Sequence, residues 1–243
     1  MKRKNVLVSI ITVCYNSEKT IRKTIESVVS QTYKNIEYLI IDGGSKDTTI
    51  DIVKEYQKKY PFIKYVSEPD NGIYDAMNKG IKMAQGDIIG MINSDDYYEL
   101  DAVENIVKNM TDDKYQVIYG YMNIYKNNVL EKTEMYYHWA INKNMINHPT
   151  CFITKDLYID KFMYDTKYKS CADYDFMIKL SKMSDVKFIP LNKIIANFNY
   201  GGVSQKVDSH IECAKMLYSH GLISKTNYHK TMLKLRIKKI FKF

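Results

Sequence analysis

Short apolar runs alternate with longer amphipathic segments along the first hundred residues of this chain. A nearly unbroken apolar run predicts a strand covered on both faces, and apolar positions three or four residues apart predict a helix packed on such a sheet. The predicted strands are residues 6–13, 36–41, 63–67 and 88–92, and the predicted helices are residues 21–29, 48–60, 73–84 and 99–110. This alternation is typical of parallel βαβ units, so we expect an α/β fold.

The second half of the chain is less regular. Residues 117–125 and 129–135 predict a hairpin around the turn at residues 126–128. Further helices are expected over residues 170–183 and 211–220, and the first of these begins with acidic side chains, as the helix dipole favours. Because there is no internal repeat and no low-complexity segment, we expect one large domain followed by a short tail.

Several predicted strands are followed by loops that carry carboxylates. Asp42 ends the second strand, Asp70 follows the third, and Asp95 and Asp96 follow the fourth. Loops after parallel strands share one edge of the sheet, so we expect these side chains to line a single crevice. Adjacent carboxylates repel each other, and a divalent metal is one compensation. An ordinary solvated turn explains the Asp95–Asp96 pair about as well.

The glycine-rich loops that usually hold phosphates do not occur in this sequence. Neither Gly-x-x-x-x-Gly-Lys-Ser/Thr nor Gly-x-Gly-x-x-Gly follows a predicted strand. A diphosphate among carboxylates requires a divalent cation between them, and oxygen ligands suit Mg²⁺ or Mn²⁺.

Positive charge is concentrated in the last thirty residues. The chain has 36 Lys and Arg against 28 Asp and Glu, which gives a net charge of +8. From residue 213 onward there is no acidic residue, and the basic ones are Lys215, Lys225, Lys230, Lys234, Arg236, Lys238, Lys239 and Lys242. The remaining body is neutral, which argues against a nucleic-acid partner and for one localised anionic contact.

The tail also has an amphipathic pattern. Leu233, Ile237, Ile240 and Phe241 recur at helical spacing, with lysines on another face. Such a helix is expected at the surface of an anionic membrane, and the alternative is a solvated helix or an oligomer contact. Four scattered cysteines, the absence of a secretory leader and the absence of an apolar span favour a cytoplasmic protein, or one at the inner face of the cell membrane.

Five segments occur in a fixed order: SIITVCYN (9–16), SQTY (30–33), IIDGGSKD (40–47), EPDNGIYDAMNKG (68–80) and NSDD (93–96). Together they resemble family 2 glycosyltransferases with the GT-A fold, of the bacterial surface-polysaccharide type. Thinner matches follow at residues 148–150, 172–175 and 201–204. The ordered set is far more specific than any one segment.

The resemblance implies a fold and a donor site. The GT-A fold is a mostly parallel, Rossmann-like sheet flanked by helices, here followed by a basic amphipathic C-terminal helix. The implied donor is a nucleotide diphosphate sugar, with a UDP-sugar as the default, and Asp42 would accept a hydrogen bond from the base. The implied donor-binding residues are Thr12, Tyr15, Asp42, Ser45, Asp70, Asn71, Lys79, Ser94 and Asp95.

The resemblance also implies a divalent metal, Mn²⁺ or Mg²⁺, at Asp95 and Asp96. One of the two carboxylates would contact ribose and the other the metal, and the family pattern leaves open which does which. Asn93 departs from the family, because many members have an acid at this position. An amide oxygen is a weaker ligand than a carboxylate, so we expect reduced metal affinity.

Asp173 matches the position of the catalytic base in the family, although Ala172 stands where members often have Glu. The implied reaction is an inverting displacement in which Asp173 deprotonates the acceptor hydroxyl. The alternative is that Asp173 only favours the helix dipole. On the acceptor side we expect His148, Trp139 and Asp175, although a lone histidine is as often structural and an aromatic cluster is often core.

These observations define a domain layout and a function. We expect a glycosyltransferase domain over residues 1–212, with a donor half (1–98) and an acceptor half (99–212), and a tail over 213–243. The product would be a hexosyl or N-acetylhexosaminyl group on a glycan or lipid-linked acceptor, and a homodimer is left open. The alternatives are a non-catalytic sugar-nucleotide or glycan-binding module and a nucleotidyltransferase, whose glycine-rich phosphate loop is missing after the first strand.

Overall fold

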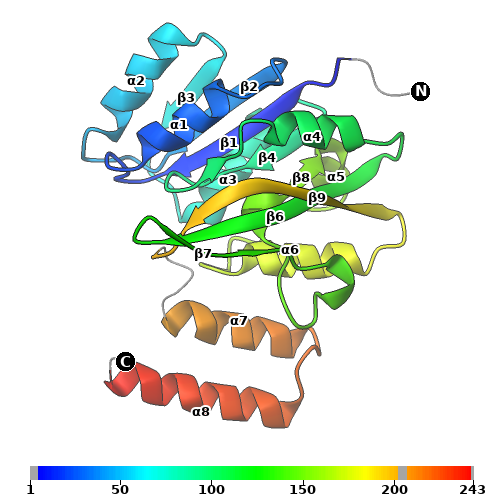
Figure 1. The fold of residues 1–243 in the computed structure, drawn as a ribbon. Coiled ribbons are helices and arrows are strands. Elements are labelled where there is room, and N and C mark those ends of the chain that lie inside the picture. Colours follow the sequence, from blue (N-terminus) through cyan, green and yellow to red (C-terminus); the bar gives the residue numbers. More distant parts are fainter. Residues whose placement is uncertain (1–4, 202–206, 242–243) are drawn as a thin grey trace.

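The computed structural model describes residues 5–201 and 207–241 of the chain. Its strands are β1 (Val8–Cys14), β2 (Ile36–Asp42), β3 (Ile63–Ser67), β4 (Ile88–Met91), β5 (Tyr97–Tyr98), β6 (Tyr115–Lys126), β7 (Val129–Glu134), β8 (Phe152–Thr154) and β9 (Val186–Asn199). Its helices are α1 (Ile21–Val29), α2 (Thr49–Lys59), α3 (Ile73–Met83), α4 (Ala102–Asn109), α5 (Lys155–Asp160), α6 (Ala172–Ser181), α7 (Val207–Ser219) and α8 (Lys225–Phe241), with short 3-10 turns η1 (His138–Ala140) and η2 (His148–Thr150). Within the described residues, the nine strands form one sheet in the order β3-β2-β1-β4-β8-β6-β9-β5, with β7 paired to β6 (Figure 1).

Strands β3, β2, β1 and β4 form a parallel unit in the predicted βαβ order. Every residue of β1, β2 and β4 is buried, which explains why their sequences are mostly apolar. Helix α1 buries Ile21, Ile25 and Val28 at the predicted spacing. The four strands and four helices predicted for this part are therefore confirmed, with ends that differ by a few residues.

The predicted hairpin is also confirmed. Strands β6 and β7 pair in antiparallel fashion, and Lys126 lies opposite Val129. The two residues between them, Asn127 and Asn128, have φ angles of 51° and 63°. Asparagine tolerates this left-handed conformation better than most residues, so the sequence fixes the turn locally.

The remaining strands pair with partners far away in the sequence, and the sequence pattern did not predict them. The three-residue β8 lies between β4 and β6 and is antiparallel to both. Strand β9 is parallel to β6 and antiparallel to β5. Its sequence contains Pro190 and two lysines, Lys187 and Lys193, which interrupt the apolar run expected of a central strand.

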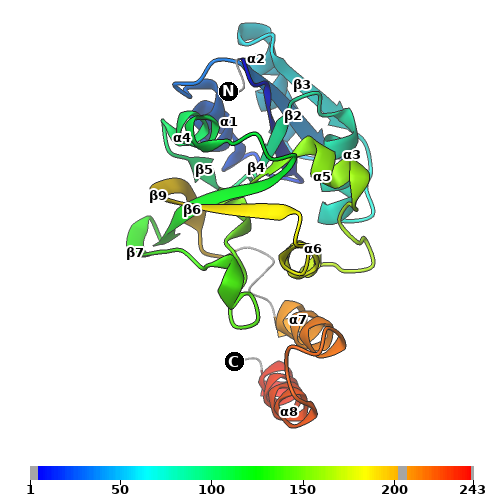
Figure 2. The same ribbon diagram turned by 90° about the vertical axis from the view of Figure 1, so that its right-hand side faces the viewer.

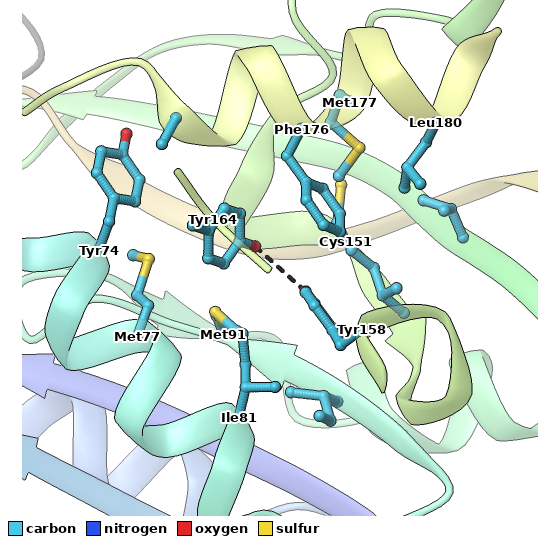
Figure 3. Close-up of a cluster of buried hydrophobic side chains, with 14 of the residues drawn as sticks. Tyr74, Met77, Ile81, Met91, Cys151, Tyr158, Tyr164, Phe176, Met177 and Leu180 are labelled. Atoms are coloured by element: carbon cyan, nitrogen blue, oxygen red, sulfur yellow. Dashed lines mark hydrogen bonds between the residues drawn. The ribbon is translucent and has the colours of Figure 1, made fainter. Parts of the chain in front are cut away.

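Two apolar cores lie on opposite faces of the sheet, and successive residues of β1 belong to different cores. Ile10 packs with residues of α1, α2 and α4, whereas Ile11 packs with residues of α3, α5 and α6. Figure 3 shows the second core, in which Tyr74, Met77 and Ile81 of α3 face side chains of α6. Because α3 and α6 share this core, the two halves of the chain are held together on one face of the sheet.

Helices α7 and α8 form a hairpin below α6, with α8 farthest from the sheet (Figures 1 and 2). The rings of Tyr218 and Tyr228 stack between them, with centroids 4.5 Å apart. Leu233 and Ile237 of the predicted apolar stripe are 63% and 47% exposed, so α8 uses another face to contact α7. The expected domain boundary between residues 212 and 213 falls inside α7.

None of the helices in the described ranges combines the length and the apolar character that are needed to span a bilayer. All four cysteines carry free thiols, three of them buried. Part of the thin match at residues 201–204, namely residues 202–204, and Lys242 of the tail lie outside the described residues.

Candidate functional site

A cavity of about 950 Å³ opens where the loops after β1, β3 and β4 meet the start of α6. Residues 15–20 and 93–95 line it from the first half of the chain, and residues 145–149 and Asp173 line it from the second half. The loop after β2 adds Asp47 and the loop after β3 adds Asp70. The loops therefore meet at one crevice as expected, but of the four carboxylates predicted to line it only Asp70 and Asp95 do so.

The lining of the cavity is acidic. Its carboxylates are Glu18, Asp47, Asp70, Asp95 and Asp173, and its lysines are Lys19 and Lys169. An anionic ligand in this cavity meets net repulsion unless a cation accompanies it.

Four of the nine predicted donor-binding residues line the cavity: Tyr15, Asp70, Ser94 and Asp95. The Tyr15 side chain is 61% exposed, so its ring is available to a ligand. The hydroxyls of Ser94 and Ser17 are 2.7 Å apart and tie the loops after β4 and β1 together. A Cβ at Gly43 would lie 2.5 Å from a carboxylate oxygen of Asp70, so glycine at this position lets the two loops approach.

Asp42 is fully buried and does not line the cavity. One of its carboxylate oxygens accepts hydrogen bonds from the backbone N–H groups of Gly44 (3.0 Å) and Ser45 (2.9 Å) and from the Ser67 hydroxyl (2.7 Å). The other oxygen accepts from the Ser45 hydroxyl. The Asp42 carboxylate and the Ser45 hydroxyl therefore shape the loop after β2.

Three further predicted residues also support the loops from behind. The buried Thr12 hydroxyl lies 3.0 Å from the Tyr38 hydroxyl, and neither residue reaches the cavity. The Lys79 ammonium contacts Glu68 at 2.9 Å and so braces the loop after β3. Asn71 hydrogen-bonds through its backbone N–H to a side chain of α3. The matching sequence segments therefore contain both residues that line the cavity and residues that only position them.

The adjacent acids Asp95 and Asp96 have different surroundings. Asp96 is 1% exposed, and its carboxylate accepts hydrogen bonds from the Asn199 backbone N–H (3.0 Å) and the Asn93 amide (3.3 Å). Asp95 lines the cavity. Burial raises the pKa of Asp95, and burial together with the nearby Asp95 charge raises the pKa of Asp96 well above its ordinary value. Asn93 acts here as a donor to Asp96, a role that an acid could not fill.

Within the described residues, no three His, Cys, Asp or Glu side chains gather into a group that could hold a metal by themselves. Magnesium-type cations are usually held by one or two carboxylates together with substrate phosphates. Asp95 fits that arrangement, because its partly buried carboxylate lines an acidic cavity and forms no ion pair with another of the described residues. Asp96 fits it less well, because its oxygens already accept protein hydrogen bonds.

Asp173 lies in the first turn of α6 and lines the same cavity as Asp95. One of its oxygens, Oδ1, accepts a hydrogen bond of 2.7 Å from the hydroxyl of Tyr74 on α3. The side chain therefore stands at the junction of the two halves of the chain, open to a bound ligand.

The three residues predicted on the acceptor side lie in different places. His148 lines the cavity, and its Nε2 is 2.8 Å from the Tyr164 hydroxyl; burial lowers the pKa of this imidazole, which favours the neutral form. Trp139 does not line the cavity but is 66% exposed, and its ring stacks on Tyr137 at 4.3 Å.

Asp175 was expected near the acceptor, and the structure corrects this. Its side chain is 3% exposed, forms an ion pair with Lys179 (2.6 Å) and is hydrogen-bonded to Nε2 of His220 (2.7 Å). Residues two positions apart lie on different sides of a helix, so Asp175 is turned away from the cavity that Asp173 lines. Its role is to fasten α6 to α7.

Several residues that line the cavity were not predicted: Glu18, Lys19, Tyr74, Met122, Met145, Lys169 and Phe198. Tyr74 lies within the matching segment 68–80, and only this match in the sequence could have pointed to a place for Tyr74 in the site. Met122 and Phe198 come from β6 and β9, and only the long-range pairing of these strands brings them to the cavity.

Comparison with known proteins gives a consistent result. The model of the family described as glycosyl transferase family 2 matches residues 9–169. Chondroitin synthase from Pasteurella multocida (strain Pm70) is 31% identical over 197 residues, which cover 79% of this chain and 20% of that protein. Putative glycosyltransferase EpsH from Bacillus subtilis (strain 168) is 38% identical over 114 residues, which cover 47% of this chain and 33% of that protein. The chain therefore spans a third or less of the length of these relatives.

Solved structures show the same fold. The crystal structure of S. aureus TarS 1-349 in complex with UDP-GlcNAc matches with a TM-score of 0.71 at 18% identity, over 98% of this chain and 73% of that one. The mannosyltransferase PcManGT from Pyrobaculum calidifontis, in complex with GDP-Man and Mn²⁺, matches with a TM-score of 0.68 at 15% identity, over 96% of this chain and 69% of that one.

Proposed function

The chain belongs to glycosyl transferase family 2 and has the GT-A fold, and we propose that it transfers a sugar from a nucleoside diphosphate sugar to a hydroxyl of a glycan or lipid-linked acceptor in bacterial surface-polysaccharide synthesis. One observation carries the proposal: Asp95 from the first half and Asp173 from the second half line the same cavity. A donor and an acceptor bound in this cavity would therefore have one carboxylate near the leaving diphosphate and another that can act as the base.

The donor that we propose is a UDP-sugar. The exposed ring of Tyr15 offers a stacking surface for the base, and Asp70 and Ser94 offer hydrogen-bonding groups in the same cavity. The names of the relatives support a role in polysaccharide synthesis, and the nucleotide sugars in the complexes of TarS and PcManGT support this donor class.

We assign the metal contact to Asp95, with Asp96 holding the loop. Asp95 would hold Mn²⁺ or Mg²⁺, which would supply Lewis-acid stabilisation of the departing diphosphate. The acidic lining of the cavity supports this assignment, because a diphosphate needs a cation there.

The reaction that we propose is an inverting displacement with Asp173 as the base. Asp173 takes the proton of the acceptor hydroxyl while the acceptor oxygen bonds to the anomeric carbon. The bond from that carbon to the diphosphate oxygen breaks, and its electron pair leaves with the nucleoside diphosphate. No covalent intermediate with the protein is needed.

For the acceptor, we propose a glycan whose chain extends past the stacked pair Tyr137 and Trp139, or a lipid-linked glycan at a membrane. The exposed Leu233 and Ile237, with Lys230 and Lys234 beside them, support a peripheral contact of α8 with anionic lipid. This contact would bring the enzyme to a lipid-linked acceptor.

The test uses the whole chain with a panel of UDP-, GDP- and dTDP-sugars, Mn²⁺, and chondroitin oligosaccharides as the acceptor probe. We expect one UDP-sugar to raise the melting temperature and to yield free UDP and an elongated oligosaccharide, or free sugar where water replaces the acceptor. Binding without release of UDP would instead indicate a non-catalytic module. Release of pyrophosphate from a sugar phosphate and a nucleoside triphosphate would indicate a nucleotidyltransferase.

A further inference from the structure

The two carboxylate oxygens of Asp173 have different surroundings. Oδ1 accepts hydrogen bonds from the Tyr74 hydroxyl at 2.7 Å and from the backbone N–H of Tyr174 at 3.0 Å. Among the described residues, no hydrogen-bond donor reaches Oδ2. Since Asp173 lines the cavity, one of its oxygens is anchored to the protein and the other is left for a ligand.

Tyr74 is well fixed to hold this carboxylate. It lies in the first turn of α3, is 5% exposed, and its ring packs against Tyr164 with a centroid distance of 5.7 Å. Figure 3 shows the Tyr74 hydroxyl directed from α3 toward the helix that carries Phe176 and Met177. Burial and the neighbouring Asp173 carboxylate raise the pKa of Tyr74 well above its ordinary value, so the hydroxyl remains a donor.

The hydrogen bond joins two parts of the chain that are 99 residues apart in sequence. Asp70 and Tyr74 both line the cavity, and they belong to the loop after β3 and the helix start that follows it. A single short segment therefore contacts the donor side of the cavity and the carboxylate on the acceptor side.

We propose that Tyr74 is a positioning residue for the transfer reaction: its hydroxyl holds Oδ1 of Asp173 so that Oδ2 faces the acceptor hydroxyl. The inference rests on the proposed role of Asp173 as the base. It adds a residue whose contribution is to orient that base, because proton transfer requires a well-aligned donor and acceptor.

The test is Tyr74→Phe in the whole chain, which removes the hydroxyl and keeps the ring. The matched control is Tyr158→Phe, because Tyr158 is also buried and, among the described residues, its hydroxyl is hydrogen-bonded only to the hydroxyl of Tyr164, at 3.2 Å. Both variants, the parent chain and Asp173→Asn are assayed with UDP-GlcNAc, Mn²⁺ and chondroitin oligosaccharides, with water as the second acceptor. Donor Kd, acceptor KM, kcat and melting temperature are measured for each.

We expect Tyr74→Phe to lower kcat about ten-fold. A positioned base contributes roughly 10²–10⁴-fold, and the variant keeps the base but loses part of its alignment. Donor Kd and acceptor KM should stay within about two-fold, and Tyr158→Phe should keep the parent kcat, since neither variant removes a group that binds the donor. The inference is overturned if Tyr74→Phe keeps the parent kcat, or if Tyr158→Phe lowers kcat to the same extent. If Asp173→Asn loses turnover but Tyr74→Phe does not, the role of Tyr74 is wrong and the role of Asp173 as the base stands. If Asp173→Asn turns over normally, the role of Asp173 as the base is wrong, and the role of Tyr74 is wrong too.

Discussion

The proposed donor half (residues 1–98) and the proposed acceptor half (residues 99–212) are built in different ways. In the first, one helix joins each pair of consecutive strands from β1 to β4, and these strands lie parallel in the sheet order β3, β2, β1 and β4. In the proposed acceptor half, β8 and β9 pair with strands from distant parts of the chain, and β9 reaches back to β5 of the first half. The loops that line the cavity from the first half are therefore placed by local structure, whereas Asp173 is placed by long-range contacts.

Both halves nevertheless use closely spaced acids in the same way. In the pair Asp95 and Asp96, the first lines the cavity and the second is buried with hydrogen-bond donors. In the pair Asp173 and Asp175, the first lines the cavity and the second is buried in an ion pair and a hydrogen bond. One acid of each pair is open to a ligand, and its neighbour fixes the segment that carries it.

The largest effect is expected from the open acid of the acceptor half. Asp173→Asn should lower kcat by about 10²–10⁴-fold, because the amide cannot accept the acceptor proton. Donor Kd should stay within about two-fold, since the cavity keeps the other groups proposed to bind the donor. Single-turnover transfer and donor titration measure the two quantities, and a matching loss of donor affinity would place Asp173 in the donor site instead.

The next largest effect is expected from the open acid of the donor half. Asp95→Ala removes the proposed metal contact itself, so it should weaken Mn²⁺-dependent donor binding by about 100-fold, at the upper end of the roughly 10–100-fold that loss of an outer-shell partner costs. Chelation of the metal should have a similar effect on the parent chain and little further effect on the variant. Calorimetric titration with UDP at fixed Mn²⁺ measures this, and undiminished binding in Asp95→Ala would shift the metal contact to Asp96.

The buried acid Asp175 should affect stability more than chemistry. Asp175→Asn should lower the free energy of unfolding by about 2 kcal/mol, because hydrogen bonds to charged groups contribute about 1.5–3 kcal/mol each and the amide retains part of them. Urea denaturation gives this value, and Asp173→Asn is the control, since that side chain lies at the cavity. A kcat loss in folded Asp175→Asn as large as that of Asp173→Asn would contradict the division of roles.

The smallest effect is expected from the tail, outside the cavity. The double variant Leu233→Ser and Ile237→Ser should sediment several-fold less with vesicles of anionic phosphatidylserine. Full burial of each apolar side chain contributes about 1.5–3 kcal/mol, and only the exposed part of each can enter the membrane. Soluble-acceptor kcat should not change. Val129→Ser, a similarly exposed apolar residue on β7, is the control. Unchanged sedimentation of the double variant would leave α8 without a membrane role.

The sequence predicted the fold of the donor half well because its signals are local. Apolar runs of β1, β2 and β4 and the helical stripe of α1 reflect burial on both faces of a sheet. Strand β9 was not predicted because Pro190 and its lysines interrupt the apolar pattern. The strand is stabilised by its pairing with β6 and β5. The predicted segments do form the site, but only some of their predicted residues line the cavity. Asp70 and Asp95 line it, whereas Thr12 and Asp42 lie behind it.

By itself, the sequence determined the family, the parallel unit and the set of loops that meet at one edge of the sheet, because these depend on residue type and local spacing. Only the tertiary structure decided which acid of each pair is open. The Asp96 carboxylate is covered by Asn199 at the end of β9, and the Asp175 carboxylate by His220 directly after α7. Tyr74 likewise reaches Asp173 only because α3 and α6 share a core. A side chain's exposure is set by its neighbours in space, and these neighbours are about 100, 45 and 99 residues away in the chain.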